Sequence, residues 1–297
     1  MTQQPDGTPS ASAREVAMIV GIGVLWGLNW PLVKLLLAEF SPWSLRAIGL
    51  SAAAAVLMTA VGLGGDRMWP QRCEWGRLVL AGLFTIFGFN LFTAFGQLET
   101  ETSKAAIIAF TMPVWAALIS ALWLGEAMTA RLVGALALGM TALGLLIAED
   151  PAGLVAAPAG PLFMLGAAVS WALGTVLLKR AAPSLAPLPR AAWMVAVSAP
   201  PAVLGAALFE APWQPELPSA GALGLLVVHV LGPLGVCYAG WSVLVARLPV
   251  TTATIGTLIV PVVGVLSAGW LVGDSLGPLR LLALVAVGGA VVTALRR

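Results

Sequence analysis

Residues 103–126, SKAAIIAFTMPVWAALISALWLGE, align without a gap on residues 251–274, TTATIGTLIVPVVGVLSAGWLVGD. The two apolar segments share a central proline, Pro113 in the first and Pro261 in the second, and each closes on a glycine followed by an acidic residue. About 20 apolar residues are enough to cross the hydrocarbon core of a bilayer. A repeated membrane-spanning segment indicates that the chain is built from two related halves.

The composition is that of a polytopic membrane protein. Hydrophobic residues make up 60% of the 297 residues and charged residues only 9%, whereas about one quarter of an ordinary soluble domain is charged. Mean hydropathy is +0.98. The net charge of +2 comes from scattered residues, so no nucleic-acid partner is expected. Cys73 and Cys237 are the only cysteines, which indicates neither a disulfide framework nor a cysteine metal site, and no cofactor is expected.

Charged residues and Gly-Pro clusters divide the chain into ten predicted transmembrane helices. They are expected at residues 15–38, 43–64, 76–97, 103–124, 129–148, 160–179, 188–209, 219–246, 251–273 and 278–295. Residues 1–13 are polar and predict a disordered cytoplasmic tail, with no cleavable signal peptide before the first span. The predicted organisation is therefore this tail, a first five-helix repeat over residues 14–150 and a second over residues 160–297.

Lysine and arginine in the short connections predict how the chain is oriented. With the N-terminus inside, the inner face collects Arg14, Arg67, Arg72, Arg77, Arg131, Lys179, Arg180, Arg190, Arg247, Arg296 and Arg297. The outer face keeps Lys34, Arg46, Lys104 and Arg280, together with most of the acidic residues. Both termini are therefore predicted to be cytoplasmic. Because each half has an odd number of spans, the second half enters from the opposite side and the repeat is inverted.

A second repeated motif supports the same division. WGLNWPLVK at 26–34 has a counterpart in WALGTVLLK at 171–179, where Trp26 matches Trp171 and Lys34 matches Lys179. Inverted repeats are typical of secondary transporters, whose substrate site lies near the midplane where the repeats meet. The predicted fold is an all-α integral membrane protein with ten transmembrane helices, arranged as two inverted five-helix repeats around a central cavity.

Several motifs follow one another in a specific order. They are Trp26-Gly27-x-Asn29-x4-Lys34, Pro42-x3-Arg46, a span centred on Pro113 and closed by Gly125-Glu126, and Ser170-Trp171-Ala172. This order resembles the EamA branch of the drug/metabolite transporter (DMT) superfamily over the whole chain after the tail. The resemblance implies a ten-helix inner-membrane carrier that exports amino acids or related metabolites. The tryptophan richness is similar to that of YddG-type aromatic amino acid exporters.

One departure from the superfamily bears on mechanism. Its small multidrug-resistance members carry a glutamate embedded in the first helix, which exchanges drug for protons. The central part of the first span here offers Trp26 and Asn29 instead. Proton-coupled drug antiport by that route is therefore not expected.

The substrate-binding candidates are polar and aromatic residues in the predicted spans. Trp26, Asn29 and Trp30 recur at helical spacing on one helix, and an amide in the membrane should face protein or water. Asn29 could equally serve as a hydrogen-bonding link to a neighbouring helix. Trp26 and Trp171 are repeat-related, so they are expected at comparable depths, as cavity walls or as core packing. Trp115 is a further aromatic candidate.

His229 and Tyr238 complete the candidate set in the eighth span. His229, the only histidine, could couple protons to transport or could be a neutral hydrogen-bonding residue of the cavity wall. At the outer ends of the first four spans, Lys34 could attract a carboxylate to the outer mouth. Snorkelling or loop pairing is the alternative there for Lys34, Arg46, Glu99 and Lys104.

Two features bear on movement and assembly. Pro113 and Pro261 remove backbone hydrogen bonds within their spans, so they are either gating hinges or static kinks. Small residues in the Ala135-x3-Gly139 and Ala286-x3-Ala290 patterns predict close helix packing, as scaffold or as a homodimer surface in the lipid bilayer.

The sequence favours a carrier of small-molecule substrates, best matched to aromatic or hydrophobic amino acids. An intramembrane enzyme would need a nucleophile with a histidine, paired aspartates or clustered acidic metal ligands, and the spans offer none of these sets. Other drug/metabolite-type substrates are the alternative: a sugar phosphate, a nucleotide sugar or a drug. Phosphorylated substrates call for Arg or Lys deep in the cavity, and none is expected at a span centre.

Overall fold

The computed structural model describes residues 13–124, 129–179, 184–210, 217–247 and 259–295. All regular elements in these ranges are helices. They are α1 (Ala13–Leu36), α2 (Pro42–Gly64), η1 (Arg72–Glu74), α3 (Trp75–Gly82), η2 (Leu83–Gly88), α4 (Phe89–Glu99), α5 (Thr102–Ala109), α6 (Met112–Leu124), α7 (Ala130–Glu149), α8 (Pro151–Ala156), α9 (Ala159–Lys179), α10 (Pro187–Phe209), α11 (Ala220–His229), η3 (Val230–Val236), α12 (Cys237–Arg247), α14 (Ile259–Leu271) and α15 (Pro278–Leu295). Most of the predicted tail, Gly125, Glu126 and the first part of the predicted span 251–273 lie outside the described residues.

The helices correspond to the predicted spans. Within the described residues, seven helical segments are long and apolar enough to cross a membrane, and three shorter apolar helices cover Val133–Glu149, Ile259–Leu271 and Pro278–Thr293. Three of the spans consist of successive elements: α3, η2 and α4; α5 and α6; and α11, η3 and α12. The helices α2, α10 and α15 begin at prolines, which suit the first helical position because that residue needs no backbone donor.

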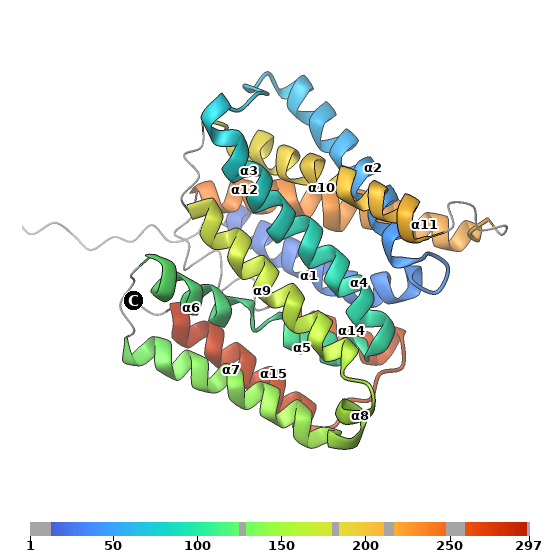
Figure 1. Cartoon of the computed structure of the whole chain (residues 1–297), viewed down its shortest axis with the longest axis vertical. Coiled ribbons are helices and arrows are strands. Elements are labelled where there is room, and N and C mark those ends of the chain that lie inside the picture. Colours follow the sequence, from blue (N-terminus) through green and yellow to red (C-terminus); the bar gives the residue numbers. More distant parts are fainter. Residues whose placement is uncertain (1–12, 125–128, 180–183, 211–216, 248–258, 296–297) are drawn as a thin grey trace, which may run out of the picture.

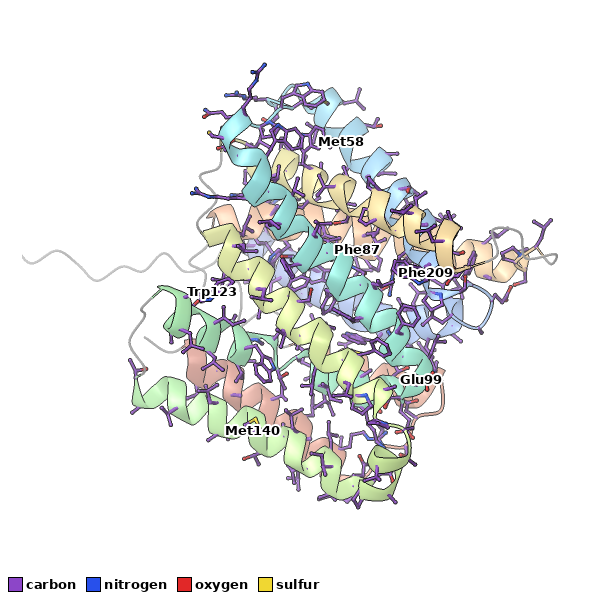
Figure 2. The ribbon with its side chains drawn as sticks, in the orientation of Figure 1. Met58, Phe87, Glu99, Trp123, Met140 and Phe209 are labelled. Atoms are coloured by element: carbon purple, nitrogen blue, oxygen red, sulfur yellow. The ribbon has the colours of Figure 1, made fainter. Side chains whose placement is uncertain are left out.

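The surface of the helix bundle is apolar. Figure 2 shows side chains standing outward around the bundle, and large apolar ones such as Trp123, Met140 and Phe209 are exposed. A soluble protein would not expose so many large apolar groups over a contiguous surface. Lipid tails solvate them well, which fits a multi-pass membrane protein.

The two five-helix halves pack against each other through equivalent helices. α2 packs along α10, and α7 packs along α15. In the view of Figure 1, α7 and α15 form one edge of the molecule and α2 and α10 lie toward the opposite edge. The other main contacts follow the same symmetry. α1 of the first half packs against α14 and α12 of the second half, and its equivalent α9 packs against α6 and α4 of the first half. The small residues Ala135 and Ala290 are buried, so within one molecule they serve the packing of α7 and α15.

Two hydrogen-bonded contacts show that the halves are inverted. The Glu39 carboxylate accepts bonds from the backbone N–H (2.6 Å) and hydroxyl (2.8 Å) of Ser219. The Glu74 carboxylate accepts the same two bonds from Ser184, with 2.6 Å to the N–H. Residues 39 and 184, and residues 74 and 219, are each 145 positions apart, as are the repeated tryptophans at 26 and 171. Each contact is therefore the repeat-related copy of the other.

These contacts lie on opposite faces of the membrane. Glu39 lies where α1 ends and α2 begins, which we call the first face, and Glu74 lies where α2 ends and α3 begins, the second face. An operation that exchanges the two halves must therefore also exchange the two faces. That is the definition of an inverted repeat, whose pseudo-twofold axis runs in the membrane plane.

The third and eighth spans each contain a π-helical segment at the same place. Adding 148 to the bounds of α4 gives those of α12, and the same shift places η2 inside η3. A π-helical turn replaces the i+4 bonds of the α-helix and leaves backbone carbonyls in need of partners. The Ser170 hydroxyl donates to the carbonyl of Phe84 at 2.7 Å, and the Trp26 indole donates to the carbonyl of Pro233 at 3.1 Å. Each donor comes from the first helix of the other repeat.

Candidate functional site

Arg46 is buried inside the helix bundle. It is the fifth residue of α2, which led to the expectation that it would lie near the outer mouth, but its side chain is only 2% exposed. Its Nε donates to the backbone carbonyl of Asn90 at 2.7 Å. Its Nη2 donates to the Thr93 hydroxyl at 3.4 Å, and its Nη1 lies 3.4 Å from Nε2 of His229. The guanidinium thus joins α2 to α4 and α11.

His229 connects this arginine to Asn29 of α1. An arginine N–H can only donate, so Nε2 of His229 accepts and the ring proton is on Nδ1. Nδ1 lies 2.7 Å from Oδ1 of Asn29, which therefore accepts that proton's hydrogen bond. The sequence analysis left Asn29 open between a cavity role and a link between helices. The structure shows the link, while Asn29 remains half-buried.

Asn90 and Tyr238 complete the group. The Asn90 amide donates to the carbonyl of Ile86 at 2.8 Å and to the Tyr238 hydroxyl at 3.4 Å. These two residues are 148 positions apart and are therefore equivalent in the two repeats. Equivalent positions that touch must lie close to the pseudo-twofold axis. We call the group Asn29, Arg46, Asn90, Thr93, His229 and Tyr238 the axial polar network.

The axial polar network lies deep in the membrane. Asn90 precedes the end of α4 by nine residues, which places it about 13 Å inside that helix end at a rise of about 1.5 Å per residue. The hydrocarbon core is about 30 Å thick. The network is therefore close to the midplane, at the depth where transporters of inverted-repeat design bind substrate.

An aromatic cluster borders the network. The Trp26 ring is half-buried one helical turn from Asn29, and its centroid lies 5.7 Å from that of Tyr238 in an edge-on arrangement. The ring centroid of Trp241 lies 6.0 Å from that of Trp26. Trp171 has a different partner, because its ring lies 4.9 Å from that of Phe89. The repeat-related tryptophans therefore belong to two separate aromatic contacts, each of which joins residues of both halves.

Three other candidates lie away from the network. Trp30 is buried against Phe110, at a centroid distance of 6.3 Å. The Trp115 indole donates to the hydroxyl of Thr111 at 3.1 Å, within α6 and the turn before it. The Lys34 ammonium group bonds the carbonyls of Gln97 and Thr100 at the end of α4. This position favours a helix-terminus role for Lys34, since a cation stabilises the negative end of a helix.

Of the two prolines expected to act as hinges, Pro113 stands at a helix start within the described residues. α5 ends at Ala109 and α6 begins at Met112, so the fourth span is interrupted just before Pro113. Pro261 is the third residue of α14, and residues 248–258 before that helix lie outside the described residues. Pro113 thus lies in the first turn of α6, where the missing N–H costs little.

A second buried arginine lies in an acidic setting at the first face. Arg280 is 1% exposed and pairs with Glu101 at 2.5 Å and with Glu149 at 3.0 Å. Lys104 lies 3.9 Å from Glu101 and 3.6 Å from Asp150. This cluster joins the ends of α5, α7 and α15. It also shows how this protein neutralises a buried guanidinium with carboxylates.

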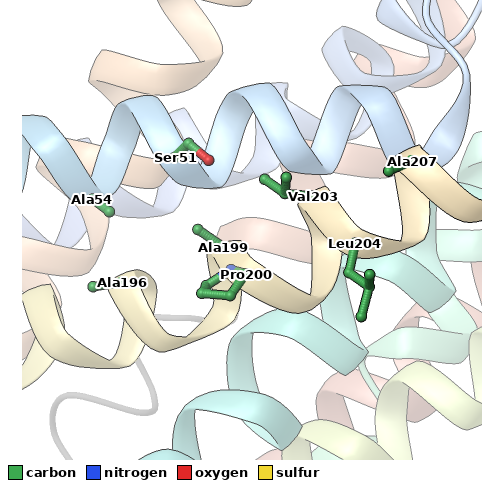
Figure 3. A pocket seen from close by; sticks show the side chains of 8 residues that line it. All are labelled: Ser51, Ala54, Ala196, Ala199, Pro200, Val203, Leu204 and Ala207. Carbon is green, nitrogen blue, oxygen red and sulfur yellow. The ribbon is translucent and has the colours of Figure 1, made fainter. Parts of the chain in front are cut away.

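A separate groove lies between α2 and α10. It has a volume of about 570 Å³ and is lined by Ser51 and by small apolar side chains of both helices (Figure 3). Ser51 follows Arg46 by five residues, which turns it about 140° around the helix at 3.6 residues per turn. The groove therefore opens on another face of α2 than the axial polar network.

Sequence reasoning missed Arg46, Asn90 and Thr93 as network residues. Asn90 could have been found by the argument used for Asn29, because an amide inside an apolar span needs a polar partner. Arg46 gave less signal, since its position near a helix start fits an interfacial residue. Among the described residues, no group of three His, Cys, Asp or Glu side chains is arranged to hold a metal ion.

The sequence was compared with known proteins. It matches the EamA-like transporter family over residues 13–148 and again over residues 158–296. It is 31% identical over 184 residues to the uncharacterized transporter YvbV of Bacillus subtilis, a match covering 62% of this chain and 58% of that protein. It is 24% identical over 271 residues to the uncharacterized inner membrane transporter YedA of Escherichia coli K12, covering 91% of this chain and 86% of that protein.

A solved structure, described only as the crystal structure of a protein, has the same fold. Its TM-score is 0.67 at 20% identity, and the match covers 96% of this chain and 98% of that one. The two family matches correspond to the two inverted halves and together span nearly the whole chain. The protein therefore belongs to the EamA-like transporter family of the DMT superfamily, whose members are transporters and not enzymes.

Proposed function

We propose that the protein is a secondary transporter of the inner membrane that exports aromatic or other hydrophobic amino acids. The observation that carries this proposal is the contact between an aromatic cluster and a polar network near the midplane. Trp26 and Asn29 lie half-buried on one face of α1, with the ring of Tyr238 beside Trp26. Aromatic rings suit an apolar side chain and attract an ammonium group. Buried polar groups suit the ammonium and carboxylate groups of an amino acid.

The proposed mechanism is alternating access between two repeats, residues 14–150 and 160–297. The interruption before Pro113 supplies one discontinuous helix, and the repeat predicts a second one at Pro261. Discontinuous helices of this kind form substrate sites and gates in inverted-repeat transporters. The excess of Lys and Arg on the second face supports a cytoplasmic position for that face and for both termini. The first face is then the outer one.

Counterflow in proteoliposomes tests the proposal. Vesicles loaded with unlabelled tryptophan, phenylalanine or leucine should accumulate the labelled amino acid from outside. Vesicles loaded with a nucleotide sugar or a sugar phosphate should not accumulate the corresponding labelled compound. Accumulation of a phosphorylated sugar with no amino acid uptake would contradict the proposal.

Two variants test the role of the aromatic cluster. Trp26→Phe keeps a ring but removes the N–H that bonds the Pro233 carbonyl, and Trp26→Ala removes both. If the ring holds the substrate, Trp26→Phe retains most of the transport and Trp26→Ala raises the half-saturation concentration by about two- to tenfold, as aromatic contacts of about 0.5–1.5 kcal/mol predict. Equal losses in the two variants would assign the effect to the hydrogen bond.

A carrier of phosphorylated sugars is the second candidate. The observation in its favour is the buried guanidinium of Arg46, which sequence reasoning did not place near the midplane. Phosphate dianions are held by several cations and hydrogen-bond donors together. The described neighbours of Arg46 are instead neutral, and an aromatic cluster borders them. This setting favours a substrate with a single negative charge and an apolar part.

A further inference from the structure

The two buried arginines of the described chain differ in one respect. Arg280, 1% exposed, is paired with the carboxylates of Glu101 and Glu149. Arg46, 2% exposed, contacts a backbone carbonyl, a threonine hydroxyl and a neutral imidazole. None of the ion pairs found among the described residues involves Arg46. Among the described residues, its positive charge therefore has no carboxylate partner.

An uncompensated charge at this depth needs a reason. A guanidinium in the apolar part of a membrane is strongly unfavourable unless it is paired, so such residues mark pathways for ions and substrates. Arg46 lies beside the pseudo-twofold axis, because its Nε bonds the carbonyl of Asn90, which touches its repeat equivalent Tyr238. The guanidinium that needs a counter-charge therefore lies at the interface of the two repeats.

The contacts of Arg46 divide its guanidinium into a held edge and an available edge. Nε makes the short bond, 2.7 Å, to a carbonyl of the α4 backbone. Nη1 and Nη2 carry four N–H groups between them, and their contacts to His229 and Thr93 are long, at 3.4 Å each. A carboxylate that approaches the Nη1–Nη2 edge can form two parallel, charge-assisted hydrogen bonds. The two weak contacts would have to be given up, and the helices around the buried side chain would have to separate to admit the carboxylate.

We infer that the Nη1–Nη2 edge of Arg46 binds the carboxylate of the transported substrate. The inference deepens the proposed function and rests on it. His229 then gains a role, because loss of the Arg46 contact leaves its Nε2 free to accept a hydrogen bond from the substrate ammonium group. Asn29 holds the ring in that tautomer by accepting from Nδ1 at 2.7 Å. The substrate class is an organic acid with one carboxylate, an amine next to it and an apolar side chain.

The first test uses the wild-type protein and three related compounds. Full-length protein in proteoliposomes is assayed for counterflow of tryptophan, tryptophanamide and tryptamine, the last two lacking the carboxylate. We expect tryptophan to be preferred over both by about tenfold or more, because a site built for a hydrogen-bonding group rejects analogues without it. Equal transport of all three would overturn the inference and leave the carrier function standing. Uptake of a nucleotide sugar with none of the three would instead overturn the proposed function.

The second test changes the arginine. Arg46→Gln should reduce tryptophan transport and bring the ratio of tryptophan to tryptamine transport close to one. Arg46→Lys keeps the charge but loses the planar fork, so its ratio should fall between those of Arg46→Gln and the wild type. Arg67→Gln removes an exposed arginine whose Nε donates to the carbonyl of Trp69, and it should keep the wild-type ratio. An equal loss for all three compounds in Arg46→Gln would assign Arg46 a structural role, and if that variant does not fold, the wild-type compound series decides alone.

Discussion

At the scale of single residues, the hydrogen bond between His229 and Asn29 can be measured by a double-mutant cycle. His229 is fully buried and its Nδ1 lies 2.7 Å from Oδ1 of Asn29. Asn29→Ala leaves a buried N–H without its acceptor, which should lower stability by about 1–3 kcal/mol. His229→Phe should also destabilise, and the double variant should lose less than the sum of the two by about 1 kcal/mol. Unfolding of the four proteins in detergent measures this coupling.

A matched control for this cycle is Thr141→Ala on α7. Thr141 is exposed and donates only within its own helix, to the carbonyl of Ala137 at 2.9 Å. Its loss should change stability by less than about 0.5 kcal/mol, as is usual for exposed positions. Additive effects of Asn29→Ala and His229→Phe would contradict the tautomer and the hydrogen bond assigned here.

Single residues also show where sequence reasoning reaches its limit. Asn29, His229 and Tyr238 stand out because polar groups are rare within apolar spans, and the structure joins them in one network. Arg46 could not be placed in the same way, because its backbone position near a helix start fits a side chain that reaches the interface. Whether a long side chain turns outward or inward depends on the tertiary partner. Here that partner is a carbonyl of α4, in another span.

At the scale of helices, glycines set how closely the two repeats approach. A Cβ on Gly27 of α1 would lie 2.5 Å from the Cβ of Val263 and 3.1 Å from the carbonyl oxygen of Val260. Gly21 lies on the same helix, and a Cβ there would meet nothing within 4 Å. Gly27→Ala should therefore destabilise by about 1–3 kcal/mol through overpacking, whereas Gly21→Ala should be neutral or stabilise by up to about 1 kcal/mol. Melting temperatures in detergent compare the two variants, and equal effects would contradict the close packing of α1 on α14.

The π-helical segments give a second prediction for the helices. Ser170→Ala removes the donor to the Phe84 carbonyl within η2, which should lower stability by about 1–2 kcal/mol. Amide exchange over residues 83–88 should rise, because that carbonyl loses its link to α9. Thr175→Val deletes a hydroxyl from the same helix, but that hydroxyl bonds the Trp171 carbonyl of α9 itself. It should leave exchange over residues 83–88 unchanged, and an equal rise in both variants would refute the link.

Helix ends were more predictable than helix interiors. Prolines and charges fixed the starts of α2, α10 and α15 within one residue of their expected positions, because both act locally on the backbone. The π segments had no comparable signal. Pro233 marks the one in the eighth span, but η2 contains no proline. Their common origin becomes visible only when the bounds of the two spans are compared.

At the scale of the whole molecule, hydrogen bonds join the two halves at both membrane faces along α2 and α10. The Glu39–Ser219 contact closes this side at the first face and the Glu74–Ser184 contact closes it at the second. Alternating access opens one face at a time. Because both contacts are formed in the same structure, we expect the α2–α10 side of the bundle to stay fixed during transport. The interrupted fourth span and α14 lie elsewhere in the bundle, where we expect the movement to occur.

The last prediction concerns the independence of these two contacts. Bonds from the backbone and hydroxyl of Ser219 lower the pKa of the Glu39 carboxyl below its ordinary value. A carboxylate with a lowered pKa contributes stability that is fully present above the ordinary pKa of about 4.3 and is lost as pH falls through the lowered value. Protection of the Ser219 amide from exchange, taken relative to an unstructured chain at the same pH, should therefore hold from neutral pH to about 5 and decline below about 4.

Glu39→Gln should remove most of this protection at every pH and abolish its pH dependence, since an amide oxygen is a weaker acceptor than a carboxylate. Protection of the Ser184 amide, held by Glu74 on the other face, should stay unchanged in that variant. Glu74→Gln should give the opposite result, in which the Ser184 amide loses its protection from exchange and the Ser219 amide keeps it. If loss of one contact instead strengthened the other, the α2–α10 side would itself take part in opening and closing, and the moving elements would have to be sought there.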